Sequence, residues 1–230
     1  MKTPYYLIDE QLLEKNLKIL QTVKKQTGCK ILLAQKCFSM FSVYPLIAKY
    51  LDGTTASGLF EAKLGYEEMH KENHVFSGAY RDDEIEEIMS ICDHVVFNSF
   101  NQWQKYQDLA KQTGTSCGIR INPECSTQIG HEIYDPCAKF SRMGVTLENF
   151  KDELLEGIEG LHFHTLCEQN SDDLVITIRA VETKFGKYLK QMKWLNFGGG
   201  HHITRVDYDL DTLINVINEI KAKYEVEVYV

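Results

Sequence analysis

The chain has 230 residues, of which 43% are hydrophobic, and carries a formal net charge of −8. This size fits one large domain, since an eight-stranded α/β barrel needs roughly 250 residues. The acidic balance, without any run of Lys and Arg, argues against nucleic acid as a partner, and no apolar run approaches the ~20 residues of a membrane helix. Seven cysteines never form a C-x-x-C pair, which favours reduced thiols in the cytoplasm.

Apolar runs and helical stripes alternate along the chain. An extended piece at 5–8 precedes a helix that Asp9 is expected to cap and that should end at Gly28. Strands are then expected at 31–35, 53–57, 73–77, 94–98, 117–122, 158–164, 194–197 and 226–230. Helices are expected between them at 40–51, 58–70, 82–92, 99–113, 146–155, 171–190 and 211–224. Together with the leading helix, this predicts eight strands and eight helices.

Regular alternation of strands and helices implies a parallel sheet with right-handed crossovers. We therefore predict an α/β fold in which residues 1–230 form a parallel (β/α)8 TIM-type barrel. An open, doubly wound sheet is the alternative, because alternation alone does not show closure. The longest irregular stretch, Asn122 to Gly144, is interpreted as a lid-like insertion after the fifth strand.

Polar residues stand where the predicted strands end. They are Lys36, Ser57, Ser77, Asn98, Arg120, His164 and Asn196. In an α/β barrel the carboxyl ends of the strands meet at one mouth, which carries the chemistry. Some of these residues, Ser57 and Asn98 among them, could instead only cap the following helix.

Lys36 follows the apolar run Ile31 to Ala34, which is typical of a strand buried on both faces. An amine held in partly apolar surroundings loses its proton more readily and can attack an aldehyde to form a Schiff base. A lysine that only caps the end of a strand or helix is the alternative interpretation.

Three consecutive glycines, Gly198, Gly199 and Gly200, follow the seventh predicted strand. They allow a tight turn that brings several N–H groups close to an anion. Because barrel enzymes commonly bind phosphate after strands seven and eight, this position favours a phosphate site over a merely flexible turn.

His162 and His164 are two residues apart on the sixth predicted strand and should project to the same face. The pair could bind a metal, stack on a flat cofactor, or be core histidines with hydrogen-bonded neighbours. No further ligands stand at a recognisable spacing, so we expect no metal. Glu168, His201 and His202 are the remaining candidates for metal ligands under the alternative interpretation.

A Schiff-base lysine, a phosphate turn and an aromatic face together describe pyridoxal 5′-phosphate (PLP). At this point the chain resembles the PLP-dependent decarboxylases of the alanine-racemase fold (fold-type III), most closely the carboxynorspermidine/carboxyspermidine decarboxylases. The resemblance extends over the whole chain. Its motifs lie at residues 33–39, 54–62, 160–169 and 197–205.

The resemblance implies a role for each matching residue. Lys36 would hold the cofactor as an internal aldimine, and His164 would stack on the pyridine ring. The glycines 198–200 would hold the phosphate. Arg120 and Arg142 are weaker candidates beside the phenolic oxygen.

The implied activity is that of a carboxy-lyase of polyamine biosynthesis, which converts carboxynorspermidine or carboxyspermidine to norspermidine or spermidine. The resemblance also implies a cytoplasmic homodimer. The alternatives are a related decarboxylase acting on diaminopimelate, ornithine or arginine, and a single-barrel protein of PLP homeostasis.

Two departures from the family are visible. Gln35 stands where an aliphatic residue is expected. Family members also continue past the eighth strand with a Glu-Pro-Gly segment and a β-rich domain, whereas this chain ends at Val230. We therefore expect a truncated chain that binds PLP weakly and has almost no activity on its own.

Overall fold

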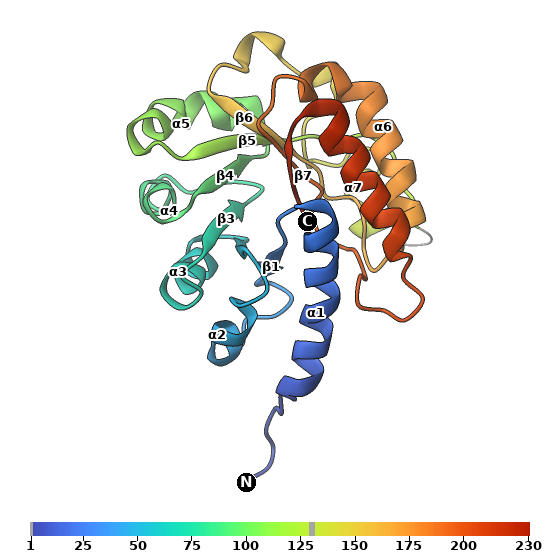
Figure 1. Cartoon of the computed structure of the whole chain (residues 1–230). Helices are drawn as coiled ribbons and strands as arrows, with labels where there is room; N and C mark the ends of the chain where they lie inside the picture. Colours follow the sequence, from blue (N-terminus) through green and yellow to red (C-terminus); the bar gives the residue numbers. More distant parts are fainter. Residues whose placement is uncertain (1, 129–131) are drawn as a thin grey trace.

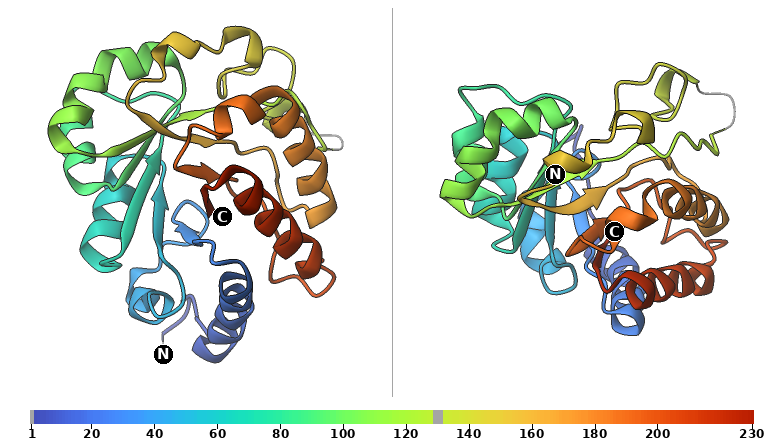
Figure 2. Two further views of the ribbon diagram at one scale, coloured as in Figure 1. Left: turned by 45° about the horizontal axis from the view of Figure 1, so that its top comes forward. Right: turned by 90° about the horizontal axis from the view of Figure 1, so that it is seen from above.

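The computed structural model describes residues 2–128 and 132–230. Strands and helices alternate along it, with the helices around the outside of the strands (Figures 1 and 2). The strands are β1 (Leu32–Ala34), β2 (Gly53–Ala56), β3 (Glu72–Phe76), β4 (His94–Phe97), β5 (Ser116–Arg120), β6 (Ile158–His162), β7 (Trp194–Asn196) and β8 (Glu227–Tyr229). Each overlaps a predicted strand and its bounds differ from the predicted ones by at most two residues, so the strand assignment is confirmed.

The sheet is parallel and closed. Each strand pairs with the next one in the sequence, in the order β1 to β8. The last strand also bonds to the first: Lys30 N donates to Val228 O, Leu32 N to Val230 O and Val230 N to Lys30 O, each at 2.9 Å. These bonds close the barrel and exclude the open, doubly wound sheet.

The α-helices lie where the apolar stripes predicted them, with one exception. They are α1 (Glu10–Thr27), α2 (Tyr44–Ile47), α3 (Leu59–Glu68), α4 (Ile85–Ile91), α5 (Phe100–Thr113), α6 (Ser171–Leu189) and α7 (Leu210–Tyr224). As predicted, Asp9 caps the start of α1 and Gly28, at φ 62°, ends it. None of the helices in the described ranges is long and apolar enough to cross a membrane.

The prediction of a helix at 146–155 is wrong. In its place are two 3₁₀ turns, η3 (Leu147–Asn149) and η4 (Asp152–Leu154), with extended backbone between them. The described part of the connection from β5 to β6 therefore contains no α-helix, and the described chain has seven α-helices instead of the predicted eight.

Aromatic packing accounts for this interruption. The ring of Phe150 lies 4.2 Å from that of Tyr188, 5.2 Å from Phe100 and 5.5 Å from Phe185, centroid to centroid. Extended backbone at Phe150 turns its side chain into this cluster between α5 and α6. Tertiary packing of this kind overrides the helix propensity of a short segment.

Inside the barrel, Trp194 occupies the space that side chains at positions 118 and 160 would otherwise need. Trp194 of β7 is only 3% exposed. A Cβ atom on Gly160 would lie 2.0 Å from its Cδ2, and one on Gly118 would lie 2.2 Å from its Cη2. The two glycines of β5 and β6 therefore make room for the indole, whose Nε1 donates to Ser116 Oγ at 2.9 Å.

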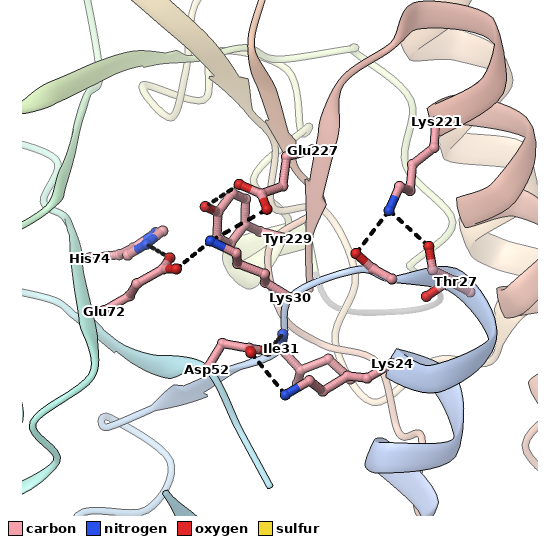
Figure 3. A network of polar contacts seen from close by, with 11 residues as sticks. Lys24, Thr27, Lys30, Ile31, Asp52, Glu72, His74, Lys221, Glu227 and Tyr229 are labelled. Carbon is pink, nitrogen blue, oxygen red and sulfur yellow. Dashed lines mark hydrogen bonds and ion pairs between the residues drawn. The ribbon is translucent and has the colours of Figure 1, made fainter.

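Charged and polar side chains fill the barrel at the amino ends of the strands (Figure 3). Lys30 contacts both Glu72 and Glu227, the latter at 3.3 Å. His74 Nε2 lies 3.2 Å from Glu72 Oε2, and the hydroxyl of Tyr229 donates to Glu227 at 2.8 Å. Burial alone would raise the pKa of Glu72, but its hydrogen bonds with His74 and Lys30 bring that pKa down to about 2. This network forms a fixed floor opposite the mouth.

Candidate active site

The mouth at the carboxyl ends of the strands brings most of the predicted site residues together. Lys36 follows β1, Arg120 is the last residue of β5, and His164 lies two residues beyond β6. The glycines 198–200 follow β7. Hydrogen bonds or direct electrostatic influence connect them.

Lys36 lies in an exposed turn, so the expectation of partly apolar surroundings is wrong. Its charge is nonetheless close enough to His162 and His164 to lower both of their pKa values, although burial is the larger cause. The neighbouring Gln35 is buried, and its Nε2 donates to Glu61 O of α3 at 2.8 Å. The amide that stands where an aliphatic residue was expected therefore has a polar partner on the helix side of the barrel wall.

His164 is fixed by two hydrogen bonds. Its Nδ1 accepts the N–H of Gly199 at 2.8 Å, and its carbonyl oxygen accepts Nη2 of Arg120 at 2.9 Å. Burial, with the charges of Lys36 and Arg120, lowers the pKa of the imidazole to about 3. The ring is therefore neutral at pH 7 and carries its proton on Nε2.

Arg120 is a buried cation, 3% exposed, with no ion pair anywhere in the described residues. Its guanidinium carbon lies 4.6 Å from the ring centroid of Phe76. Burial lowers its pKa to about 10, so the group is still charged at pH 7. A buried, unpaired guanidinium beneath the mouth favours an anionic ligand.

The glycine turn lies directly on the segment that follows β6. Gly198 has φ 70° and Gly200 has φ 91°, and Cβ atoms there would lie 2.3 Å from Phe163 O and 2.0 Å from Leu166 O. Both the backbone conformation and the close approach thus require glycine.

Two of the three glycine N–H groups are already used. That of Gly198 donates to Asn196 Oδ1 at 2.8 Å, and that of Gly199 to His164. The N–H of Gly200 has no partner among residues 2–128 and 132–230. This turn therefore offers an anion one free donor, and its other two N–H groups hold its shape.

Arg142 is not part of the cluster. Its side chain is exposed, while its carbonyl oxygen accepts Asn98 Nδ2 at 2.8 Å. Asn98 Oδ1 also accepts the N–H of Gly144 at 2.8 Å, so this side chain holds the β5–β6 connection. The cap of α5 is the next residue, Ser99, not Asn98.

No role was predicted for Phe76, and His162 was predicted together with His164 as a metal ligand, a residue stacked on a flat cofactor or a core histidine. The two rings lie 5.3 Å apart inside the barrel, below the mouth. Burial, Arg120 and His164 lower the pKa of His162 well below 6.5, and its buried Nδ1 has no partner in the described chain. The alternation of inward side chains on β3, β5 and β6 was the available signal. No group of three His, Cys, Asp or Glu side chains suited to a metal occurs among the described residues.

No family model matches the chain. It is 44% identical over 229 residues to carboxynorspermidine/carboxyspermidine decarboxylase of Campylobacter jejuni, covering 100% of this chain and 59% of that protein. It is 36% identical to the protein of the same description from Herminiimonas arsenicoxydans, covering 62% of it. A third relative, 38% identical with 58% covered, is the carboxyaminopropylagmatine decarboxylase of Synechocystis.

Solved structures of decarboxylases are also similar to this chain. Carboxynorspermidine decarboxylase of C. jejuni, solved in complex with norspermidine, has a TM-score of 0.92 at 42% identity, with all of this chain and 59% of that one covered. Diaminopimelate decarboxylase of Helicobacter pylori has a TM-score of 0.81 at 17% identity, with all of this chain and 63% of that one covered, and shows the fold alone.

The chain is thus a TIM-type barrel of the kind found in fold-type III decarboxylases. Its resemblance to the carboxynorspermidine/carboxyspermidine decarboxylases is confirmed. The chain spans about 59% of the length of the relatives it matches.

Proposed function

We propose that this barrel is the PLP-binding part of a decarboxylase that acts on carboxynorspermidine or carboxyspermidine. The observation that carries the proposal is the position of His164. Gly199 holds this neutral ring at the mouth, where Lys36 and the buried Arg120 supply positive charge. The relatives at 36–44% identity support the substrate class.

The residues at the mouth fit PLP group by group. The amine of Lys36 would bind the aldehyde, and the face of His164 would lie against the pyridine ring. The unpaired guanidinium of Arg120 suits an anionic ring oxygen, and the glycine turn with its free Gly200 N–H suits the phosphate. Once bound, PLP would supply an electron-accepting ring for the electron pair that a departing carboxylate leaves behind.

The protein's own contribution is orientation and charge. The bond from Gly199 to Nδ1 leaves the proton of His164 on Nε2, so this edge can donate a hydrogen bond. Arg120 stays in place through its bond to His164 O and its contact with Phe76. Groups held in this way need little rearrangement when charge develops during the reaction.

The proposed assembly is a cytoplasmic homodimer. Four exposed apolar side chains support a partner at the mouth, since all lie in segments that follow the carboxyl ends of strands: Phe41, Phe60, Phe140 and Val206. Further contacts to substrate would come from the partner and from sequence that the relatives have in addition. We expect the 230-residue chain alone to bind PLP weakly and to turn over at most one hundredth as fast as the complete enzyme.

The test is a PLP titration of the chain, followed by assays of decarboxylation. A visible absorbance band that saturates is expected. In the complete enzyme, product should form from carboxynorspermidine or carboxyspermidine faster than from carboxyaminopropylagmatine or diaminopimelate. A saturating band without decarboxylation of any of them would favour a protein of PLP homeostasis, and the absence of a band would refute the proposal.

A further inference from the structure

Gln169 connects three of the loops around the mouth. It follows β6, and its backbone pairs with the segment after β7. Its N–H donates to Gly200 O at 3.0 Å, and its carbonyl oxygen accepts the N–H of His202 at 3.2 Å. The backbone on either side of His201, directly after the last glycine, is thus bonded to Gln169.

The side chain of Gln169 extends to the loop after β5. Its Nε2 donates to both the carbonyl and the hydroxyl oxygen of Thr127, at 3.0 and 2.7 Å. Its Oε1 accepts Nε2 of Gln128 at 2.7 Å and the N–H of Cys167 at 3.3 Å. Both donors and both acceptor positions of the amide are occupied, so its orientation is fixed.

This arrangement matters because the bonds to Asn196 and His164 hold the first two glycines of the turn, whereas Gly200 is bonded through Gln169. Gly200 lies so close to Leu166 O that any shift of the segment 165–169 would move it. Gln128 also donates to Thr165 O at 3.1 Å, which ties the start of that segment to the loop after β5. Gln169 and its partners therefore hold Gly200, which carries the free N–H, at the end of the turn.

We propose that Gln169 is a positioning residue for the cofactor's phosphate: it locks the loops after β5, β6 and β7 so that the glycine turn is formed before the ligand arrives. This inference rests on the proposed function. It concerns the phosphate alone, because the bonds of Gln169 reach the glycine turn and not Lys36. Loss of these bonds would cost phosphate affinity through ordering of the turn on binding.

The experiment compares Gln169→Met with the unchanged chain, using PLP and pyridoxal, which lacks the phosphate. Methionine keeps the volume and adds no charge that could itself repel a phosphate. We expect the Kd for PLP to rise about tenfold and the Kd for pyridoxal to change by less than twofold. Thr127→Val, which removes a single acceptor, should shift the same ratio in the same direction by a smaller factor.

A matched control exists at the loops after β3 and β4. The half-buried Gln102 also joins loops, since its Nε2 donates to Gly78 O at 2.8 Å and its Oε1 accepts Asn98 N at 3.0 Å. Gln102→Met should lower Tm to a similar extent without changing the ratio of the two Kd values.

The outcomes separate the two proposals. If Gln169→Met raises the Kd values for PLP and pyridoxal by the same factor, or changes neither, the positioning role is refuted while PLP binding stands. If the Gln169→Met variant does not fold, Thr127→Val decides: an unchanged ratio of the two Kd values in that variant refutes the positioning role. If the unchanged chain binds neither ligand, the proposed function fails, and this inference fails with it.

Discussion

The backbone N–H of Gly199 donates to Nδ1 of His164 at 2.8 Å, a bond between residues 35 positions apart. It joins the glycine turn after β7 to the ring that follows β6. Because Nδ1 is occupied as an acceptor, the neutral imidazole has its proton on Nε2. The proposed phosphate site and the proposed ring-stacking residue are therefore one unit, and damage to either should affect both.

Replacing His164 by alanine should weaken PLP binding. The change removes the stacking face and leaves the N–H of Gly199 without its acceptor, which together should raise the Kd ten- to one-hundredfold. A PLP titration measures this, and replacement of an exposed histidine, His202→Ala, serves as the control. An unchanged Kd, or bound zinc that disappears with His164, would contradict the assignment.

Arg120→Met should separate stability from binding. The guanidinium is buried without an ion pair in the described structure, so burying its charge costs free energy that the bond to His164 O and the contact with the Phe76 ring offset only in part. We expect Tm to stay level or rise, while the Kd for PLP increases at least tenfold. Thermal melts and titrations of one preparation test both effects. A sharp fall in Tm together with unchanged affinity would show that Arg120 serves the fold and not the ligand.

The barrel was predictable because its signals are local. Short apolar runs bounded by polar residues mark buried parallel strands wherever they occur, and Asp9 and Gly28 mark the ends of α1. The clustering of Lys36, Arg120 and His164 followed from topology, since each stands at the end of a strand. None of these inferences needed contact between distant side chains.

The remaining features depend on such contacts. Neither the closure of the sheet by Lys30 and Val228 nor the bond between Gly199 and His164 leaves any periodic trace in the sequence. The helix predicted at 146–155 failed because Phe150 enters an aromatic cluster formed by two other helices. The exposure of Lys36 was equally hidden, since it depends on what surrounds the mouth.

Acid should destabilise the fold through His94. This ring lies 4.1 Å from that of His74 and 4.8 Å from that of Trp194, centroid to centroid, and burial lowers its pKa to about 3. The unfolded chain binds a proton below about pH 6.5 and the folded chain does not, so stability is complete above that pH and falls as pH drops towards 3. Between pH 6.5 and pH 5 the loss of unfolding free energy due to His94 amounts to about 2 kcal/mol.

Urea denaturation at pH 7 and pH 5 tests this prediction. His94→Phe should reduce the loss of unfolding free energy between the two pH values by about 2 kcal/mol. The exposed His70→Gln should leave the loss unchanged. An equal pH dependence in the His94 variant and the unchanged chain would show that other groups carry it.

Gly160→Ala should damage the barrel interior. The added methyl group would lie 2.0 Å from the indole of Trp194, which has no space to move. Overpacking of this kind costs about 1–3 kcal/mol, and more where backbone must shift. Gly78→Ala is the matched control, because a Cβ atom there meets nothing within 4 Å. Equal unfolding free energies for the two variants would contradict the described packing.

The central claim is that PLP binds at Lys36, and borohydride reduction followed by peptide mass mapping tests it most directly. The PLP-loaded chain is reduced, digested and searched for a lysine that carries the pyridoxyl group. The prediction is a label on Lys36 that is lost in Lys36→Arg. A label instead on Lys30, whose amine contacts Glu72 in the barrel floor, or on the surface residue Lys63 would contradict the account.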